Sequence, residues 1–451
     1  MIVRDLKRAL LLLVPLVALL LISASLWHSG GSASLGSLLL GHDGVGRVRP
    51  GAPMPSRQHR KPTLTANKTH MEIYSLSSPD GRFFDIRFGI DVFNPNIVPH
   101  PKFNNTWYVV GQMYGDWAGL DRKKGDIYES HEVGCIAQFL NGVLMCIDFV
   151  KGLPIAHTKG GLCKGDIAYI NFGAGPHDAR VFMGPESPFI TYGSNSDFTC
   201  FGQWVQDFRH LVDWEYVLMT NTDFPTGTEM QRPAPYSAME KNYFLFWDRD
   251  GEMHVHYDMY PKRGFSKLER SGAVGPNIAN KTTKADEQCI MAHMPKLPEE
   301  HESVHQATNS LKITLCNRAD PKCEPHDGNT YIMTIIQHKT YYGYHSEYEP
   351  YVVLFQQRAP FELHAISKRP LWISGRKRGE GRRTDMLYVT SANWRDRGVN
   401  YHGYLDDVVM LGFGVEDRHA GGMDVLAADL VSEMGLCVEY EDEEEVDVEK
   451  R

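Results

Sequence analysis

Short apolar runs separated by turn-forming residues make up most of the chain beyond its N-terminal segment. The run Tyr243–Trp247 is followed by Asp248-Arg249-Asp250-Gly251 and then by Met253–Tyr257, in which histidines alternate with apolar residues. Asn141-Gly142 separates two further runs in the same way. Asn-Gly and Asp-Gly pairs favour tight β-hairpins because these residues tolerate positive φ. The pattern therefore predicts antiparallel strands joined by hairpins.

Five groups of such strands recur, at about residues 85–149, 175–219, 243–257, 310–367 and 386–425. Helical periodicity is confined to Val425–Met434, which we expect to close the domain as a helix. Five groups of short strands are typical of an all-β fold, a five-bladed β-propeller. A β-sandwich or a β-helix is the alternative interpretation.

The N-terminal segment differs from the rest of the chain. Three basic residues (Arg4, Lys7 and Arg8) precede an uncharged apolar run over residues 9–27. Its length suits one transmembrane helix, and the basic flank predicts a cytoplasmic tail at residues 1–8. A cleaved signal peptide, with small residues at 23–25, is the alternative. Residues 28–68 are rich in Gly, Ser and Pro and predict a flexible stem, so the folded domain is expected over residues 69–437.

Charge and cysteine content support a luminal location for that domain. The formal net charge is −9, but acidic residues concentrate in residues 438–451, which we expect to be disordered. The near-neutral remainder argues against a nucleic-acid partner. Eight cysteines and the sequons at Asn67, Asn104 and Asn280 predict disulfides and N-glycosylation in the Golgi or ER. Cys316 and Cys323 are spaced to close a short loop, and the other pairings stay open.

Candidate chemistry begins with Asp178-Ala179-Arg180, at the start of a predicted strand. Residues two apart on a regular strand point to the same side, so a carboxylate and a guanidinium would lie together. The carboxylate can move a proton and the guanidinium can hold an anion. The alternative interpretation is a simple salt bridge between the two side chains.

Three patches resemble a known family. Residues 175–182 with 186–195 (GPHDARVF and ESPFITYGSN), Met239–Pro261 and Asn400–Asp417 resemble motifs of five-bladed propeller enzymes that act on β-mannosides. That family includes β-mannoside phosphorylases and β-1,2-mannosyltransferases. In its second-blade motif a Glu and a Pro stand where this chain has His177 and Ala179. The resemblance implies a propeller fold and chemistry on sugars.

A propeller gathers the starts of its innermost strands around a central channel, which predicts the site. We expect Asp178 to be the acid/base, Arg180, Lys241 and Lys339 to hold phosphate, and Asp407 and Asp417 to bind sugar hydroxyls. The remaining predicted substrate-binding residues are Asn94 and Asn242.

No metal or other cofactor is expected. Asp248-Arg249-Asp250 resembles the metal-binding D-x-D of other glycosyltransferases, but its position between two strands predicts a hairpin turn. His254-x-His256 shows no third ligand nearby, and His131-Glu132 lacks the spacing of H-E-x-x-H.

The predicted function is that of a single-pass, luminal glycosyltransferase. It would transfer mannose or a related sugar, with inversion, from a nucleotide-sugar donor to a glycan acceptor. A hydrolase or phosphorylase acting on β-mannosides is the second hypothesis. A non-catalytic propeller that binds glycans is the third.

Overall fold

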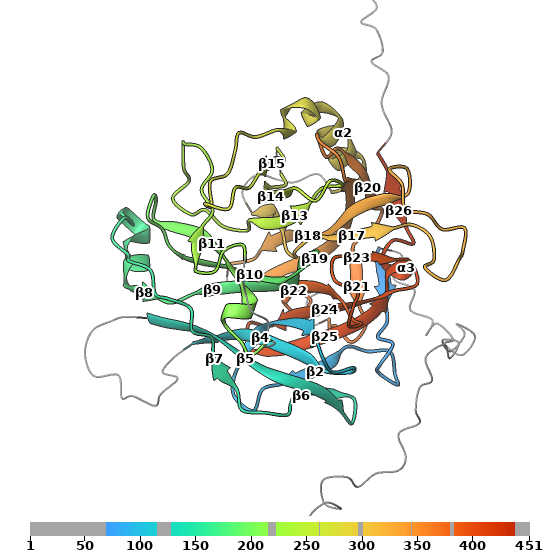
Figure 1. The fold of residues 1–451 in the computed structure, drawn as a ribbon, viewed down its shortest axis with the longest axis horizontal. Helices are drawn as coiled ribbons and strands as arrows, with labels where there is room; N and C mark the ends of the chain where they lie inside the picture. The colour runs from blue at the N-terminus through green and yellow to red at the C-terminus, as the bar shows by residue number, and fades with distance from the viewer. Residues whose placement is uncertain are drawn as a thin grey trace, which may run out of the picture. The chain divides into compact units, whose positions relative to one another are not determined.

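The computed structural model describes residues 69–114, 128–214, 222–260, 262–295, 301–343, 345–378 and 383–437 (Figure 1). The chain divides into two units, Met1–Leu64 and Thr65–Arg451, and every described residue belongs to the second. The predicted cytoplasmic tail, membrane anchor, stem, acidic tail and Asn67 lie outside the described residues. Within the described ranges, no helix combines the length and apolarity needed to cross a bilayer.

Strands dominate this unit, which confirms the prediction of a mostly β protein. The first group has antiparallel neighbours in chain order: β3 (Phe93–Pro99), β4 (Trp107–Tyr114), β5 (Tyr128–Leu140) and β6 (Val143–Cys146). Two short strands, β7 (Lys151–Gly152) and β8 (Gly173–Ala174), also pair with β5. Asn141 and Gly142 have φ of 53° and 81°, so the predicted hairpin is confirmed.

The second and third groups are also antiparallel throughout. The second contains β9 (His177–Met183), β10 (Pro188–Asn195), β11 (Phe201–Asp207) and β12 (Thr228–Glu229). The third contains β13 (Phe244–Trp247), β14 (Met253–Asp258) and β15 (Gly264–Lys267). Most of the strand expected at 214–219 lies outside the described residues.

The fourth group is the largest. Its strands are β16 (Glu302–Gln306), β17 (Leu311–Thr314), β18 (Thr330–Tyr341), β19 (Ser346–Gln356) and β20 (Leu363–Ser367), with β23 (His402–Tyr404) and β26 (Met434–Leu436) at its edges. The fifth group contains β22 (Leu387–Trp394), β24 (Val408–Val415) and β25 (His419–Leu426). A separate parallel pair joins β1 (Met71–Ile73) to β21 (Leu371–Ile373).

Two sequence predictions need correction. Strand β2 (Phe84–Arg87), expected in the first group, is antiparallel to β25 and parallel to β6, so it links the last group to the first. The helix expected over 425–434 is reduced to α3 (Ala427–Leu430), because β25 and β26 occupy its ends. An unexpected helix, α2 (Thr283–His293), follows the third group. Short 3₁₀ helices complete the described elements: η2 (Gly165–Phe172), η3 (Phe208–His210) and η4 (Ala279–Lys281).

Apolar clusters join the groups in chain order. One cluster packs Val98 of the first group with Val181 of the second, and another unites the second, third and fourth. A third cluster joins the fourth and fifth groups, and a fourth cluster packs Met410 of the fifth group with Ile97 of the first. Each group is therefore sealed against its neighbours, and the last against the first, by removal of apolar surface from water.

Buried asparagines connect the innermost strands across group boundaries. Asn393 on β22 donates to the carbonyl oxygens of Ile97 and Val181 at 3.0 and 3.1 Å and accepts from the Met183 N–H at 3.2 Å. Asn96 on β3 donates to the Ala179 carbonyl oxygen on β9 and accepts from the Val181 N–H of the same strand. These amides fix the mutual register of β3, β9 and β22, because each supplies a donor and an acceptor to neighbouring backbone.

Four disulfides use all eight cysteines: Cys135–Cys146, Cys163–Cys200, Cys289–Cys437 and Cys316–Cys323. The predicted Cys316–Cys323 loop is confirmed. The Cys289–Cys437 bridge ties α2 to the segment that follows β26.

Candidate functional site

Three strand groups share an uncommon backbone conformation where their first strand begins. Asn94 on β3, Asp178 on β9 and Asn242 before β13 have φ of 52°, 53° and 62°. Left-handed backbone is unfavourable for residues other than glycine, although Asn and Asp tolerate it best. Such conformations concentrate at functional sites, so the end of the sheets where these strands begin is the candidate site.

Asp178 lies in a β-bulge. The pairing of β9 with β10 shifts from Arg180–Thr191 to His177–Gly193, which breaks the regular alternation assumed from the sequence. The Asp178 N–H donates to Gln112 Oε1 at 3.2 Å, and the side chain itself is exposed. Asp178 and Arg180 still line one pocket.

Arg180 is buried and held by backbone oxygens. Its Nη1 donates to the carbonyl oxygens of Asp178 and Ala179 at 2.9 and 3.0 Å, and its Nε to that of Ala307 at 3.2 Å. Its guanidinium carbon lies 5.6 Å from the centre of the Tyr388 ring. The ion pairs found among the described residues do not include Asp178 with Arg180, so the alternative interpretation of a simple salt bridge is wrong.

Glu132 on β5 holds the backbone of the bulge and was not among the predicted site residues. Its Oε1 accepts the Ala179 N–H at 3.1 Å, whereas Oε2 has no hydrogen-bond partner among the described residues. Burial raises the pKa of Glu132 to about 8, against the lowering effect of the Ala179 N–H and Arg180. Glu132 is therefore mostly protonated at pH 7. A charged residue directly before apolar Val133 was the available signal in the sequence.

Two lysines give the site positive charge. Lys241 lines the pocket, and Lys339 on β18 is close enough that burial and the charge of Lys241 lower its pKa. Burial and the same two lysines lower the pKa of His305 to about 4, so this imidazole is neutral at pH 7. Within the described ranges, neither lysine forms an ion pair within 4 Å. Unpaired, mutually repelling lysines favour the binding of an anion.

Asp417 completes the cluster from the fifth group. It follows β24 with φ of 47°. Partial desolvation raises the pKa of Asp417, the charges of Asp178 and Glu416 raise it further, and Lys339 opposes them. The structure thus brings together five predicted residues: Asp178, Arg180, Lys241, Lys339 and Asp417.

Asp407 is not part of this cluster. It precedes β24, whereas Asp417 follows it, and eight residues of strand at ~3.3 Å each separate the two by about 25 Å. Its Oδ2 lies 2.6 Å from Nη2 of Arg318 and accepts the Tyr404 N–H at 2.7 Å. These contacts stabilise the loops at the opposite end of β24.

The two predicted asparagines differ in accessibility. Asn94 is buried, and any side chain at Gly414 would collide with its Oδ1. Asn242 lines the pocket, and its backbone N–H donates to Gln203 Oε1 at 3.0 Å. Asn242 can therefore meet a ligand, whereas the Asn94 side chain lies against Gly414 and does not line the pocket.

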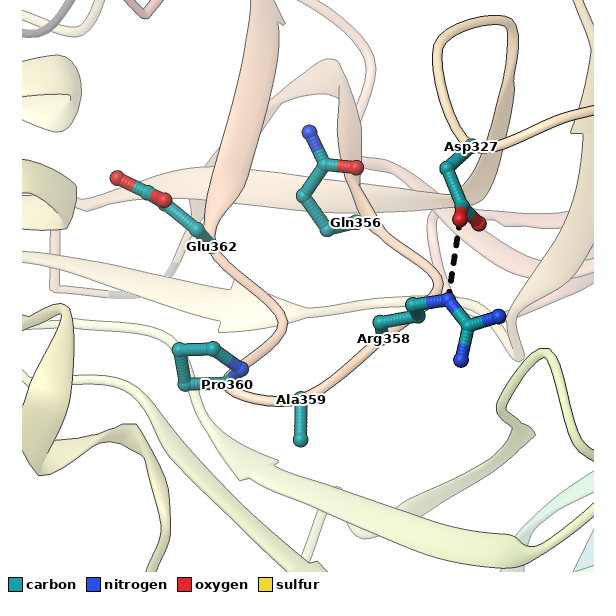
Figure 2. A pocket seen from close by; sticks show the side chains of 6 residues that line it. All are labelled: Asp327, Gln356, Arg358, Ala359, Pro360 and Glu362. Carbon is teal, nitrogen blue, oxygen red and sulfur yellow. Dashed lines mark hydrogen bonds and ion pairs between the residues drawn. The ribbon is translucent and has the colours of Figure 1, made fainter.

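A second hollow lies at the opposite edge, beside the chain that follows β19. Figure 2 shows Arg358 bonded to Asp327, with Gln356, Pro360 and Glu362 around them. Asp327 also pairs with Arg249. Because Asp327 and Arg358 neutralise each other, we assign this hollow to structure.

The other motifs of the sequence are structural in this fold. Asp248 Oδ1 accepts the N–H groups of Asp250 and Glu252 at 2.9 Å each, which confirms the hairpin turn. His254 stacks on Phe246, and His256 stacks on Phe265. No group of three metal-binding side chains occurs in the described part of the chain. Asn104 and Asn280 are exposed, and their glycosylation stays a prediction.

Comparisons with known proteins come only from structure. No family model and no curated protein sequence matches this chain. A β-1,2-mannobiose phosphorylase from Listeria innocua is 11% identical and covers 76% of this chain and 92% of its own, with a TM-score of 0.43. A glycosyl hydrolase from Bacteroides ovatus is 10% identical and covers 78% of this chain and 90% of its own, with a TM-score of 0.41. A GDP-Man-dependent mannosyltransferase from Leishmania mexicana is 9% identical and covers 76% of this chain and 89% of its own, with a TM-score of 0.36. TM-scores below 0.5 assign neither fold nor activity.

Proposed function

We propose that this chain is an enzyme that transfers a glycosyl group, with Asp178 as its acid/base. The observation that carries the proposal is the exposed Asp178, whose backbone in the β-bulge is left-handed. Two lysines without ion pairs and a second carboxylate, Asp417, lie near it. The scaffold we propose is a five-bladed propeller whose blades are the five strand groups, with the site where the innermost strands begin.

The proposed step is an inverting displacement at the anomeric carbon. The acceptor hydroxyl gives its proton to Asp178 and its oxygen forms the new glycosidic bond. The old bond to the leaving group breaks on the opposite face, and its electron pair leaves with the departing anion. Lys241 and Lys339 stabilise that anion, while Asp417 accepts hydrogen bonds from sugar hydroxyls. Arg180 contributes positive potential and fixes the bulge.

The donor and location that we propose follow from the sequence. The lysine pair suits the diphosphate of a nucleotide sugar, and the resemblance of the three motif patches favours mannose or a related sugar. Residues 1–27 favour a single-pass protein whose enzyme domain is luminal. Phosphorolysis of β-mannosides is the second candidate, because inorganic phosphate would fit the same two lysines.

The test compares the purified full-length protein with Asp178→Asn. Nucleotide sugars and β-mannosides would be offered, with and without inorganic phosphate. We expect turnover of a nucleotide sugar by the wild type and a loss of at least a hundredfold in Asp178→Asn. Asp407→Asn, at the opposite edge, is the matched control and should keep wild-type activity. Phosphate-dependent cleavage would replace the transferase by the phosphorylase, and equal activity in both variants would refute the site.

A further inference from the structure

Four exposed aromatic side chains lie on the loops that precede β9, join β10 to β11 and precede β13. They form what we call the aromatic rim: Tyr169, Phe172, Phe198 and Tyr236, with exposed fractions of 69%, 58%, 47% and 38%. Single exposed apolar residues are common on proteins. These four are unusual because a disulfide and hydrogen bonds connect the loops that carry them.

The Cys163–Cys200 disulfide joins the first two loops. Both cysteines are buried, and Ile167 and Ile170 of η2 pack against them. In a 3₁₀ helix, residues three apart share a face. Tyr169 and Phe172 are also three apart, so they share a different face of η2 and stay exposed.

The third loop is tied to the second. Phe198 and Tyr236 have ring centres 6.3 Å apart. The Thr199 hydroxyl donates to the Ser237 carbonyl oxygen at 2.8 Å. The Phe201 N–H donates to the Ala238 carbonyl oxygen at 3.1 Å. The rim is therefore anchored by one disulfide and by hydrogen bonds to backbone carbonyl oxygens.

Two of the segments that carry the rim also lead into residues that line the candidate pocket. Phe201, next to Cys200, lines the pocket and its ring centre lies 5.9 Å from that of His177. Gly193 makes room for this ring, because a Cβ there would lie 2.4 Å from it. The third loop leads directly into Lys241 and Asn242, which also line the pocket.

We propose that the aromatic rim binds the acceptor glycan of the proposed transferase, by stacking on the apolar face of a sugar ring. The lysine side of the pocket suits an anionic donor, whereas the rim side chains are uncharged and suit a neutral sugar. Aromatic rings offer a large, stiff contact surface at small entropic cost. This inference rests on the proposed function, since it assigns the rim to the second substrate of the same site.

The experiment separates acceptor from donor. Phe198→Ala and Tyr169→Ala are compared with Phe149→Ala, a control at an 88% exposed ring on the loop after β6. Donor hydrolysis without acceptor reports the proposed function. Transfer to β-1,2-mannobiose or methyl mannoside reports the rim. We expect each rim variant to raise the acceptor KM by about two- to tenfold with unchanged donor hydrolysis. Phe198→Tyr should keep the wild-type KM.

Each further outcome decides between the two proposals. An acceptor KM that is equal in the rim variants and in Phe149→Ala overturns the rim. If the wild type consumes no donor, the proposed function fails, and saturation-transfer NMR with β-1,2-mannobiose tests the rim by itself. Contact signals that weaken in Phe198→Ala but persist in Phe149→Ala support it, and signals that do not change refute it.

Discussion

Glu132→Gln gives the sharpest test of the electrostatics behind the bulge. Glutamine has the shape of a protonated glutamate, and its amide oxygen can accept the Ala179 N–H as Glu132 Oε1 does at 3.1 Å. The substitution therefore removes the titration of this carboxyl while it keeps the contact. Any pH-dependent difference between the two proteins then reports the burial of Glu132.

The size of the effect follows from the two pKa values. An unfolded glutamate loses its proton near 4.5, whereas folded Glu132 keeps it up to a pKa of about 8. Folding therefore becomes less favourable as pH rises through this window, with full stability below 4.5. At 1.36 kcal/mol per pKa unit, the whole window costs about 5 kcal/mol, of which about 3 kcal/mol is lost by pH 7.

The assay is denaturant unfolding of the wild type and Glu132→Gln between pH 4 and pH 8.5. We expect the stability of the variant relative to the wild type to increase with pH by roughly 3 kcal/mol between pH 4 and pH 7. Glu132→Ala is the control: it also removes the titration, but it leaves the Ala179 N–H without an acceptor, so it should be less stable than Glu132→Gln at every pH. A stability difference between wild type and Glu132→Gln that does not vary with pH would refute the reasoning.

Three further predictions test other parts of the fold and site. Asn393→Leu should lower the free energy of unfolding by about 2–4 kcal/mol, because three buried backbone groups lose their partner; a loss below 0.5 kcal/mol in urea titrations would contradict this. Lys339→Met should weaken binding of the nucleotide-sugar donor about tenfold or more, measured by calorimetry at two salt concentrations; unchanged affinity would remove Lys339 from the anion site. Burial lowers the pKa of His256 well below 6.5, so wild-type stability should fall as pH drops below 6.5, and His256→Phe should reduce that fall in thermal scans; equal pH profiles would be inconsistent with it.

Local features of the structure were predictable because few residues decide them. The Asn141-Gly142 hairpin depends on two residues that tolerate positive φ. The Cys316–Cys323 loop needs only seven residues of separation. Helix α2 was not predicted because few of its residues are apolar. The helix is stabilised by packing Cys289 and Ile290 into the apolar cluster of the neighbouring strands.

Long-range pairing was less predictable. Strand β2 looks like the first strand of the first group, since nothing in its four residues indicates a partner near the C-terminus. Its pairing with β25 depends on how the chain returns to its start. Asp407 and Asp417 are equally acidic in the sequence, and only the direction of β24 places them at opposite edges.

The sequence by itself determined the strands, the hairpins and the residue types available for acid–base and anion-binding chemistry, because these depend on neighbours along the chain. Only the tertiary structure decided which of them meet. The bulge at Asp178 requires β10 and Gln112 as partners, and the raised pKa of Glu132 requires complete burial behind it. The site exists because residues distant in sequence lie together at one end of the strands, where desolvation and neighbouring charges shift their pKa values.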